Sequence, residues 1–267
     1  MVPGTSLIPI HDENPTSTFS YLTALLIAVN VVILFFVQPN FGQDLACPRG
    51  FTECAIQRCR VQQFFYEWGL VPDEVTDGSQ LTGSVCPGFP LRDKSVLGSI
   101  VTSMFLHGGI LHLGGNMLFL WVFGNNIEDR LGRVKFLLFY FVVGIAAGLA
   151  HVLANPDSQI PTVGASGAVS GLLGAYMVLF PRAHIHAILP IPILWLLLGR
   201  IRLPAFVVLG MWFVSQFFIG QGQQPGEGGV AWVAHVGGFI AGAILIFVFG
   251  GWRERQRPQP QPGWPYA

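Results

Sequence analysis

Long apolar segments recur along the whole sequence, and they limit what this chain can fold into. A helix that crosses a bilayer needs about 20 mostly apolar residues, because each residue adds about 1.5 Å and the hydrocarbon layer is about 30 Å thick. Short polar stretches separate most of the segments, as expected of an all-α polytopic membrane protein. The six segments that qualify are residues 21–37, 105–124, 134–153, 163–180, 204–220 and 230–249.

The composition agrees with a membrane protein and disfavours other classes. Only 10% of the residues are charged and 52% are hydrophobic, whereas about a quarter of the residues in a soluble globular domain are charged. The mean hydropathy is +0.56. The formal net charge is +0, so nucleic acid is not an expected partner, because no basic stripe is present to neutralise phosphates.

The sequence predicts one membrane domain with two flanking segments. Residues 21–250 form the six-span domain, residues 1–20 precede it, and residues 251–267 form a tail rich in Pro, Gln and Arg that is expected to be disordered. A long polar loop, residues 38–94, follows the first span. The apolar run 187–198 contains two prolines and is too short to span, so we interpret it as an interfacial or re-entrant piece.

Basic residues predict the orientation in the membrane, because short cytoplasmic loops carry an excess of Lys and Arg. The loops after the second and fourth spans and the tail are basic, whereas those after the third and fifth spans contain no Lys or Arg. We therefore place both termini in the cytoplasm and loop 38–94 outside, and a bacterial plasma membrane fits this compact form. The residues that set this orientation are Arg130, Arg133, Lys135, Arg182, Arg200, Arg202, Arg253, Arg255 and Arg257.

All four cysteines lie in the predicted outer loop. In an oxidising compartment, four cysteines confined to one loop favour two disulfides, for which three pairings are possible. Four free thiols are the alternative. A zinc site is less favoured, because the loop contains no Cys-x-x-Cys pair and no histidine. The candidate cysteines are Cys47, Cys54, Cys59 and Cys86.

A serine and a histidine at similar depth are candidates for nucleophilic catalysis. Ser166 follows Gly164 and precedes Gly167 near the outer end of the fourth span, and His235 lies near the outer end of the sixth. A serine hydroxyl is a weak nucleophile until a base takes its proton. Alone, the serine and its glycines could serve helix packing, and the histidine could hydrogen-bond across helices. The pair at one depth favours a nucleophile and its base.

Small residues predict that these two spans approach closely. Gly238 and Gly242 share a stripe with His235, and Gly167 and Gly171 lie beside the serine stripe of the fourth span. Small residues spaced four apart let two helix backbones come together in lipid. Such a contact would bring the histidine within hydrogen-bonding distance of the serine.

The second span adds three polar residues, His107, His112 and Asn116. His112 and Asn116 are four residues apart and therefore share one helical face. Their side-chain N–H groups could stabilise an oxyanion, as acyl transfer requires. A buried polar network that holds helices together is the alternative. A metal site is not favoured, because there is no His-Glu-x-x-His motif and no nearby carboxylate.

Taken together, these motifs resemble the rhomboid family of intramembrane proteases. The matching pieces are Gly-x-Ser-Gly at 164–167, the His-x-Gly-Gly run from His235, and the His-x-x-x-x-His-x-x-x-Asn pattern of the second span. Glu128 and Gly132 in the following loop also match. The resemblance extends over all six spans, leaves out much of the first loop, and implies a six-transmembrane-helix bundle.

The resemblance implies a Ser–His dyad without a third acidic residue and without a cofactor. Ser166 would attack the scissile carbonyl, and His235 would act as general base and then as general acid. His112, Asn116 and the Ser166 backbone N–H would bind the oxyanion. Substrates would be single-span membrane proteins, cut near the outer surface of the lipid bilayer. The residues that would support this arrangement are His107, Gly164, Gly167 and Gly238.

The chain departs from the family at two places. Many members have an aromatic residue four positions after the nucleophile, which stacks on the histidine, whereas this chain has Ser170. The base must then be oriented in another way, for which a hydroxyl is one candidate. The Trp-Arg pair that many members carry in the first loop is also missing, so the usual fold of that loop is not assumed.

Two other functions remain as alternatives. A catalytically inactive relative could bind membrane clients, but such relatives typically lose the serine or the histidine, and both are present here. A transporter is disfavoured, because the polar residues cluster at the outer edge of the spans and no inverted repeat is visible.

Overall fold

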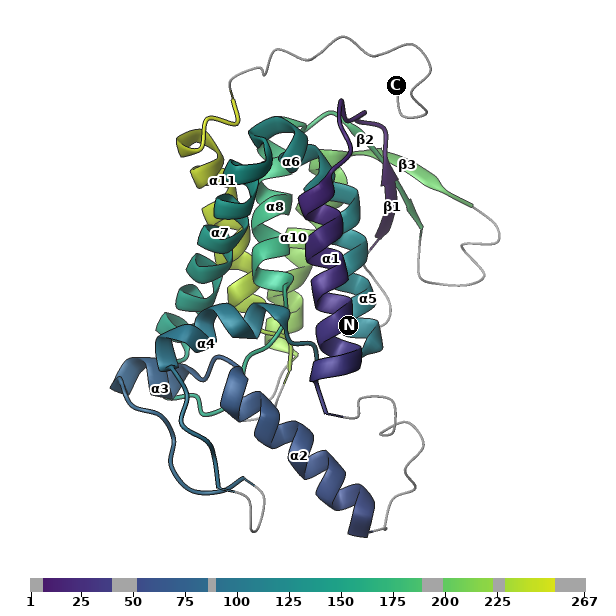
Figure 1. The fold of residues 1–267 in the computed structure, drawn as a ribbon. Coiled ribbons are helices and arrows are strands. Elements are labelled where there is room, and N and C mark those ends of the chain that lie inside the picture. Colours follow the sequence, from purple (N-terminus) through teal and green to yellow (C-terminus); the bar gives the residue numbers. More distant parts are fainter. Residues whose placement is uncertain (1–6, 40–51, 86–89, 189–198, 223–228, 253–267) are drawn as a thin grey trace.

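The computed structural model describes residues 7–39, 52–85, 90–188, 199–222 and 229–252. A helix lies in each of the six predicted apolar segments, and together these helices form a bundle (Figure 1). The main helices are α1 (Tyr21–Val32, extended by the π-helical turn η1, Ile33–Val37), α5 (Ile110–Phe119), α7 (Arg133–Ala154), α8 (Ser166–Leu179), α10 (Ala205–Gln221) and α11 (Trp232–Val248).

Helix α8 lies in the middle of this bundle (Figure 1). Every residue from Ala168 to Tyr176 on α8 is buried. A helix that is buried on all sides has no polar face, which explains its continuous run of small and apolar residues. The other helices therefore take their positions around α8.

Helices α8 and α11 pack backbone against backbone. A Cβ atom at Gly238 would collide with the carbonyl oxygen of Gly167, and a Cβ atom at Gly242 would collide with the carbonyl oxygen of Gly171. Further along the same contact, no Cβ fits at Gly174 against the α11 backbone. The close approach that the small-residue stripes predict is present, and it leaves no room for larger residues.

Only one or two clear membrane-span candidates exist among the described helices. Helix α7 is long and apolar enough to cross a membrane by itself, with 22 residues and a mean hydropathy of 2.3 in its most apolar window. The helical stretches Val96–Phe105 and Ile110–Leu131 are long and apolar enough only when taken together, and they are bent by 83° relative to each other. The other apolar helices have 10–17 residues, and 17 residues rise only about 25 Å. The fold is thus mostly helical, and six complete spans stay a prediction.

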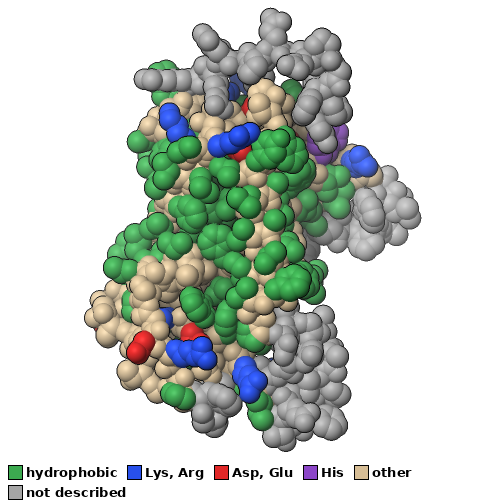
Figure 2. All heavy atoms as spheres, viewed as in Figure 1, with side chains coloured by type: hydrophobic (Ala, Val, Ile, Leu, Met, Phe, Trp, Pro, Cys, Tyr) green, Lys and Arg blue, Asp and Glu red, His purple; other side chains and the backbone are tan. Residues whose placement is uncertain are grey.

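Hydrophobic side chains gather over the middle of the face drawn in Figure 2, and Lys, Arg, Asp and Glu lie toward its two ends. Several helices carry strongly exposed apolar residues, such as Leu153 at 82%, Phe218 at 69% and Ile244 at 60% exposure. Contiguous exposed apolar surface marks a region that contacts a membrane or another protein.

The prediction of a helix over 105–124 is wrong at its beginning. Helix α4 (Val96–Thr102) and the short turn η2 (Ser103–Phe105) end before a non-helical stretch at 106–109. Gln38, which follows α1, holds this stretch, because its side-chain amide exchanges two hydrogen bonds of 3.0 Å with the backbone of His107. The chain then continues without interruption through α5, η3 (Leu120–Gly124) and α6 (Asn125–Leu131).

The all-α prediction misses a three-stranded antiparallel sheet of order β1-β2-β3. Its strands are β1 (Ile8–Asp12), β2 (His184–Ile188) and β3 (Ile201–Pro204). The run 187–198, predicted to be interfacial or re-entrant, begins inside β2. Its residues 189–198 and most of the predicted tail, 253–267, lie outside the described residues. Strand β2 does alternate polar and apolar residues from His184 to Ala187, but four residues are the shortest alternating run that indicates a strand.

Two buried carboxylates fasten the start of the chain to the bundle. Asp12, at the end of β1, accepts hydrogen bonds from the Tyr176 hydroxyl at 2.7 Å and from the Asn126 side chain at 2.8 Å. Burial raises the pKa of the Asp12 carboxyl. Glu128 accepts the backbone N–H of Thr23 at 2.7 Å in the first turn of α1, where the helix dipole stabilises a negative charge.

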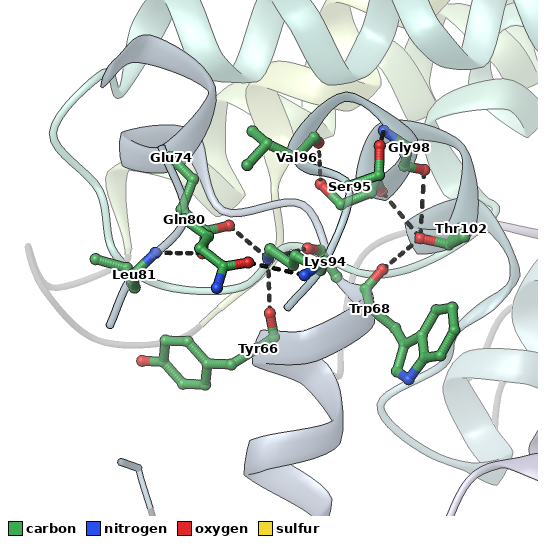
Figure 3. A network of polar contacts seen from close by, with 12 residues as sticks. Tyr66, Trp68, Glu74, Gln80, Leu81, Lys94, Ser95, Val96, Gly98 and Thr102 are labelled. Carbon is green, nitrogen blue, oxygen red and sulfur yellow. Dashed lines mark hydrogen bonds and ion pairs between the residues drawn. The ribbon is translucent and has the colours of Figure 1, made fainter. Parts of the chain in front are cut away.

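The loop 38–94 contains α2 (Thr52–Trp68) and α3 (Pro72–Asp77), and its described part is organised around Lys94 (Figure 3). The Lys94 ammonium pairs with the Glu74 carboxylate and donates to the carbonyl oxygens of Tyr66 at 2.6 Å and Gly69 at 3.2 Å. The Lys94 and Glu74 side chains are only 7% and 2% exposed. A cation at the carboxyl end of α2 also complements the helix dipole.

Cys59, on α2, is disulfide-bonded. The side chains of Cys47, Cys54 and Cys86 lie outside what the structure describes. The pairing of the four cysteines therefore stays a prediction.

We expect Lys94→Met to destabilise the loop 38–94, because it leaves the Glu74 carboxylate buried without its counter-ion. Breaking a buried ion pair in this way typically costs about 3–5 kcal/mol. Limited proteolysis should cut the loop much faster in this variant. The exposed Arg92 provides the matched control, and Arg92→Met should resist protease as the wild type does. Equal resistance in both variants would contradict a stabilising role for the pair.

We expect Gly238→Leu to lower the thermal stability of the protein in detergent, because the new side chain cannot fit against the α8 backbone. Forcing extra bulk into a packed contact typically costs about 1–3 kcal/mol or more. Ile244→Val changes a residue on the same helix that is 60% exposed and should leave the melting temperature almost unchanged. An unchanged melting temperature in Gly238→Leu would mean that α8 and α11 do not meet through this face.

Candidate active site

Ser166 is the first residue of α8. Backbone N–H groups in the first turn of a helix have no acceptor within the helix, and the helix dipole favours negative charge there. The N–H groups of Ser166 and Gly167 therefore stand next to the serine hydroxyl as potential anion-binding donors. Ser166 is half-buried.

Gly164 shapes the space in front of the serine. Its φ of +132° lies in a region that favours glycine, and its N–H donates to the Ser103 carbonyl at 2.9 Å. A Cβ atom at Gly164 would lie 2.9 Å from His112 Nε2 and 3.4 Å from Ser166 Oγ. His112 and the Ser166 hydroxyl therefore border the same small space, and a side chain at position 164 would fill it.

His112 and Asn116 lie on α5, as their spacing predicts. His112 Nδ1 accepts the Gly108 backbone N–H at 3.2 Å, so the proton of a neutral ring is assigned to Nε2, the atom that faces the serine. Asn116 is buried and donates one amide N–H to the His112 carbonyl at 3.0 Å. Its second N–H remains for another acceptor.

His107 occupies a different place from the other predicted site residues. It is fully buried in the non-helical stretch before α5. Its ring packs edge-on against the His112 ring, with 5.2 Å between centroids. His107 is thus positioned to hold the His112 ring.

His235 is the fourth residue of α11, and a residue that we did not single out from the sequence contacts it. The Oε1 atom of Gln216, on α10, lies 2.7 Å from His235 Nδ1. The Trp212 ring lies beside the imidazole, with 5.9 Å between centroids. A signal was available, because Gln216 and the neighbouring Ser215 are the polar side chains of an otherwise apolar segment, and polar groups at membrane depth are functional by default.

Ser170 does not replace the missing aromatic residue. Its hydroxyl donates to the Ser166 carbonyl at 2.6 Å, within α8. The hydroxyl is therefore engaged by its own helix, and Gln216 and Trp212 flank the histidine instead.

The glycine contact between α8 and α11 sets Ser166 and His235 near each other. Gly167 directly follows Ser166, Gly238 lies three residues after His235, and these two glycines are in contact. Among the hydrogen bonds of the described residues, none joins the side chains of Ser166 and His235. Catalytic hydrogen bonds are often long without substrate and tighten when it binds.

The potential donors described around Ser166 are N–H groups, which suit acyl transfer. Within the described part of the chain, no group of three His, Cys, Asp or Glu side chains has a geometry that could hold a metal ion.

Several curated proteins are similar to this chain. Rhomboid protein 1, mitochondrial, of Saccharomyces cerevisiae is 33% identical over 164 residues, which is 60% of this chain and 44% of that protein. Rhomboid protease GluP of Bacillus subtilis is 35% identical over 109 residues, 39% of this chain and 21% of that protein. RHOMBOID-like protein 5 of Arabidopsis thaliana is 31% identical over 171 residues, 61% of this chain and 52% of that protein. The chain thus spans about half of these relatives' length or less.

The Rhomboid domain, as a family, matches residues 94–252. That stretch is more than half of the chain and contains the α5, α8 and α11 residues described above. The resemblance drawn from the motifs is confirmed, and this chain belongs to the rhomboid family.

Proposed function

We propose that this chain is a serine endopeptidase that cleaves membrane proteins with Ser166 as nucleophile and His235 as general base. The observation that carries the proposal is the convergence of three elements. Ser166 opens α8, His235 lies in the first turns of α11, and His112 on α5 faces the serine hydroxyl. A nucleophile, a base whose far nitrogen is hydrogen-bonded, and nearby N–H donors are the parts that acyl transfer requires.

In the first step, His235 Nε2 takes the proton of the Ser166 hydroxyl as Oγ attacks the scissile carbonyl carbon. The carbonyl π electrons move to oxygen and give a tetrahedral oxyanion. The imidazolium then donates its proton to the leaving amine, the C–N bond breaks, and an acyl-serine remains. Water, deprotonated by His235, hydrolyses this ester and regenerates the serine.

The oxyanion would be stabilised by N–H groups from two helices. The Nε2–H of His112 and an amide N–H of Asn116 come from α5, and the backbone N–H of Ser166 comes from the start of α8. Because these donors are held by their own hydrogen bonds, little reorganisation is needed as the charge develops.

The proposed setting is a lipid bilayer crossed by all six apolar helices. The apolar band in Figure 2 supports this. The sheet end, which carries Arg133 at the start of α7 and Arg202 in β3, would face the cytoplasm of a bacterial cell, and the loop with the cysteines would face outside. Ser166 then lies toward the outer side, and single-span membrane proteins are the proposed substrates.

We expect Ser166→Ala and His235→Ala each to abolish cleavage of a model transmembrane substrate while the protein still inserts. When two residues act as one catalytic unit, the first substitution removes nearly all of the activity. The double variant should therefore be no less active than either single variant. A serine-directed fluorophosphonate should label the wild type and not Ser166→Ala. No labelling and no cleavage by the wild type would instead support an inactive protein that binds membrane clients.

We expect a graded loss for the oxyanion donors. Removing one donor typically costs about 3 kcal/mol, a factor of about a hundred in rate, so Asn116→Ala and His112→Ala should each keep measurable activity. The measurement is kcat for the same substrate, with melting temperature as the check on folding. If well-folded Asn116→Ala cleaves at the wild-type rate, Asn116 serves helix packing and not oxyanion binding.

A further inference from the structure

Gln216 is a buried polar residue in an apolar helix. Its side chain is 3% exposed, and most of its neighbours on α10 are apolar. Burying an amide costs free energy unless its hydrogen bonds are made. The partners of this amide therefore indicate why a glutamine occupies the position.

The two ends of the amide are distinguished by their partners. The Gln216 Nε2 donates to the Trp212 carbonyl at 2.9 Å and lies 3.1 Å from the Ser215 hydroxyl. A carbonyl oxygen can only accept, so a flipped amide would place two oxygens against each other. The amide oxygen consequently faces His235, where it lies 2.7 Å from Nδ1.

An amide oxygen can only accept a hydrogen bond, and this determines the tautomer of His235. The proton of the neutral ring must reside on Nδ1, which leaves the lone pair of Nε2 free. That tautomer is the one a general base needs, because the nitrogen that takes the serine proton must be unprotonated. The Trp212 ring alongside restricts rotation of the imidazole.

We propose that Gln216 is the positioning residue of the catalytic histidine, holding His235 in the Nδ1–H tautomer and orienting Nε2 toward Ser166. This inference rests on the proposed protease function. Gln216 does not touch substrate, and it acts through His235 as the third member of a Ser–His–Gln arrangement. A neutral acceptor also suits a low-dielectric setting, where an unpaired carboxylate would be costly.

Two substitutions separate positioning from packing. Gln216→Met keeps the length of the side chain but removes the acceptor. Gln216→Glu keeps an acceptor for Nδ1–H but, when ionised, cannot donate to the Trp212 carbonyl. If Gln216 positions the base, Gln216→Met should lower kcat by about a hundredfold with little change in KM, whereas Gln216→Glu should keep a large part of the wild-type kcat. If the amide only stabilises α10, Gln216→Glu should lower kcat as much as Gln216→Met or more.

The control on the same helix is Phe218→Leu, at a position that is 69% exposed, and it should keep the wild-type kcat. Fluorophosphonate labelling of Ser166 should slow in Gln216→Met in parallel with kcat. A wild-type kcat in Gln216→Met, or equal losses of kcat in Gln216→Met and Gln216→Glu, would overturn the inference. Failure of Ser166→Ala to affect cleavage would instead overturn the proposed function itself.

A second measurement needs no substitution at Gln216. Nitrogen NMR of protein with labelled histidine, assigned with His235→Ala, reports which ring nitrogen carries the proton. We expect the His235 Nδ1–H tautomer in the resting protein. Observation of the Nε2–H tautomer would overturn the inference whether or not the Gln216 variants fold.

Discussion

The glycines of α8 and α11 form a backbone-to-backbone contact around which the other helices are arranged. Gly167 and Gly171 on α8 meet Gly238 and Gly242 on α11 with no side chain between the backbones. In lipid there is little hydrophobic force between helices, so association relies on close van der Waals packing, which small residues permit. Because this contact begins one residue after Ser166 on α8 and three residues after His235 on α11, it also determines where the serine and the histidine lie.

Around this contact, polar ties between distant parts of the chain hold the surrounding helices in place. Glu128 caps α1 from more than a hundred residues away, and Asp12 joins β1 to α8 through Tyr176. At the other end of the bundle, Lys94 and Glu74 organise the loop 38–94. Each of these groups is buried and therefore stabilising only while its partner is present. A rigid frame of this kind suits a site whose parts come from four different helices, because catalysis needs its groups held in position before the substrate arrives.

Much of the helical framework could be predicted from the sequence, because the apolar segments are long and their small-residue stripes are regular. The spacing of His112 and Asn116 correctly places them on one helix face, and the Gly238 stripe correctly predicts a close neighbour. The break before α5 was not predicted, because it depends on a distant residue. The side chain of Gln38 makes the hydrogen bonds to the backbone of His107 that a helix would otherwise make. The strands β1 to β3 escaped prediction because they are short and pair residues that are far apart in the sequence.

The membrane-type composition, most of the helices, the family and the candidate residues for chemistry can all be inferred from the amino-acid sequence. These properties follow from local patterns and from motif spacing. How the candidate base is held depends instead on the three-dimensional packing of the helices. Ser170 suggested that His235 lacks an aromatic stacking partner and that a hydroxyl orients it instead. The hydrogen bond to His235 is made by Gln216 on α10. The reason is physical, since a hydrogen bond between two helices depends on their separation and rotation, which packing around α8 sets and no local pattern encodes.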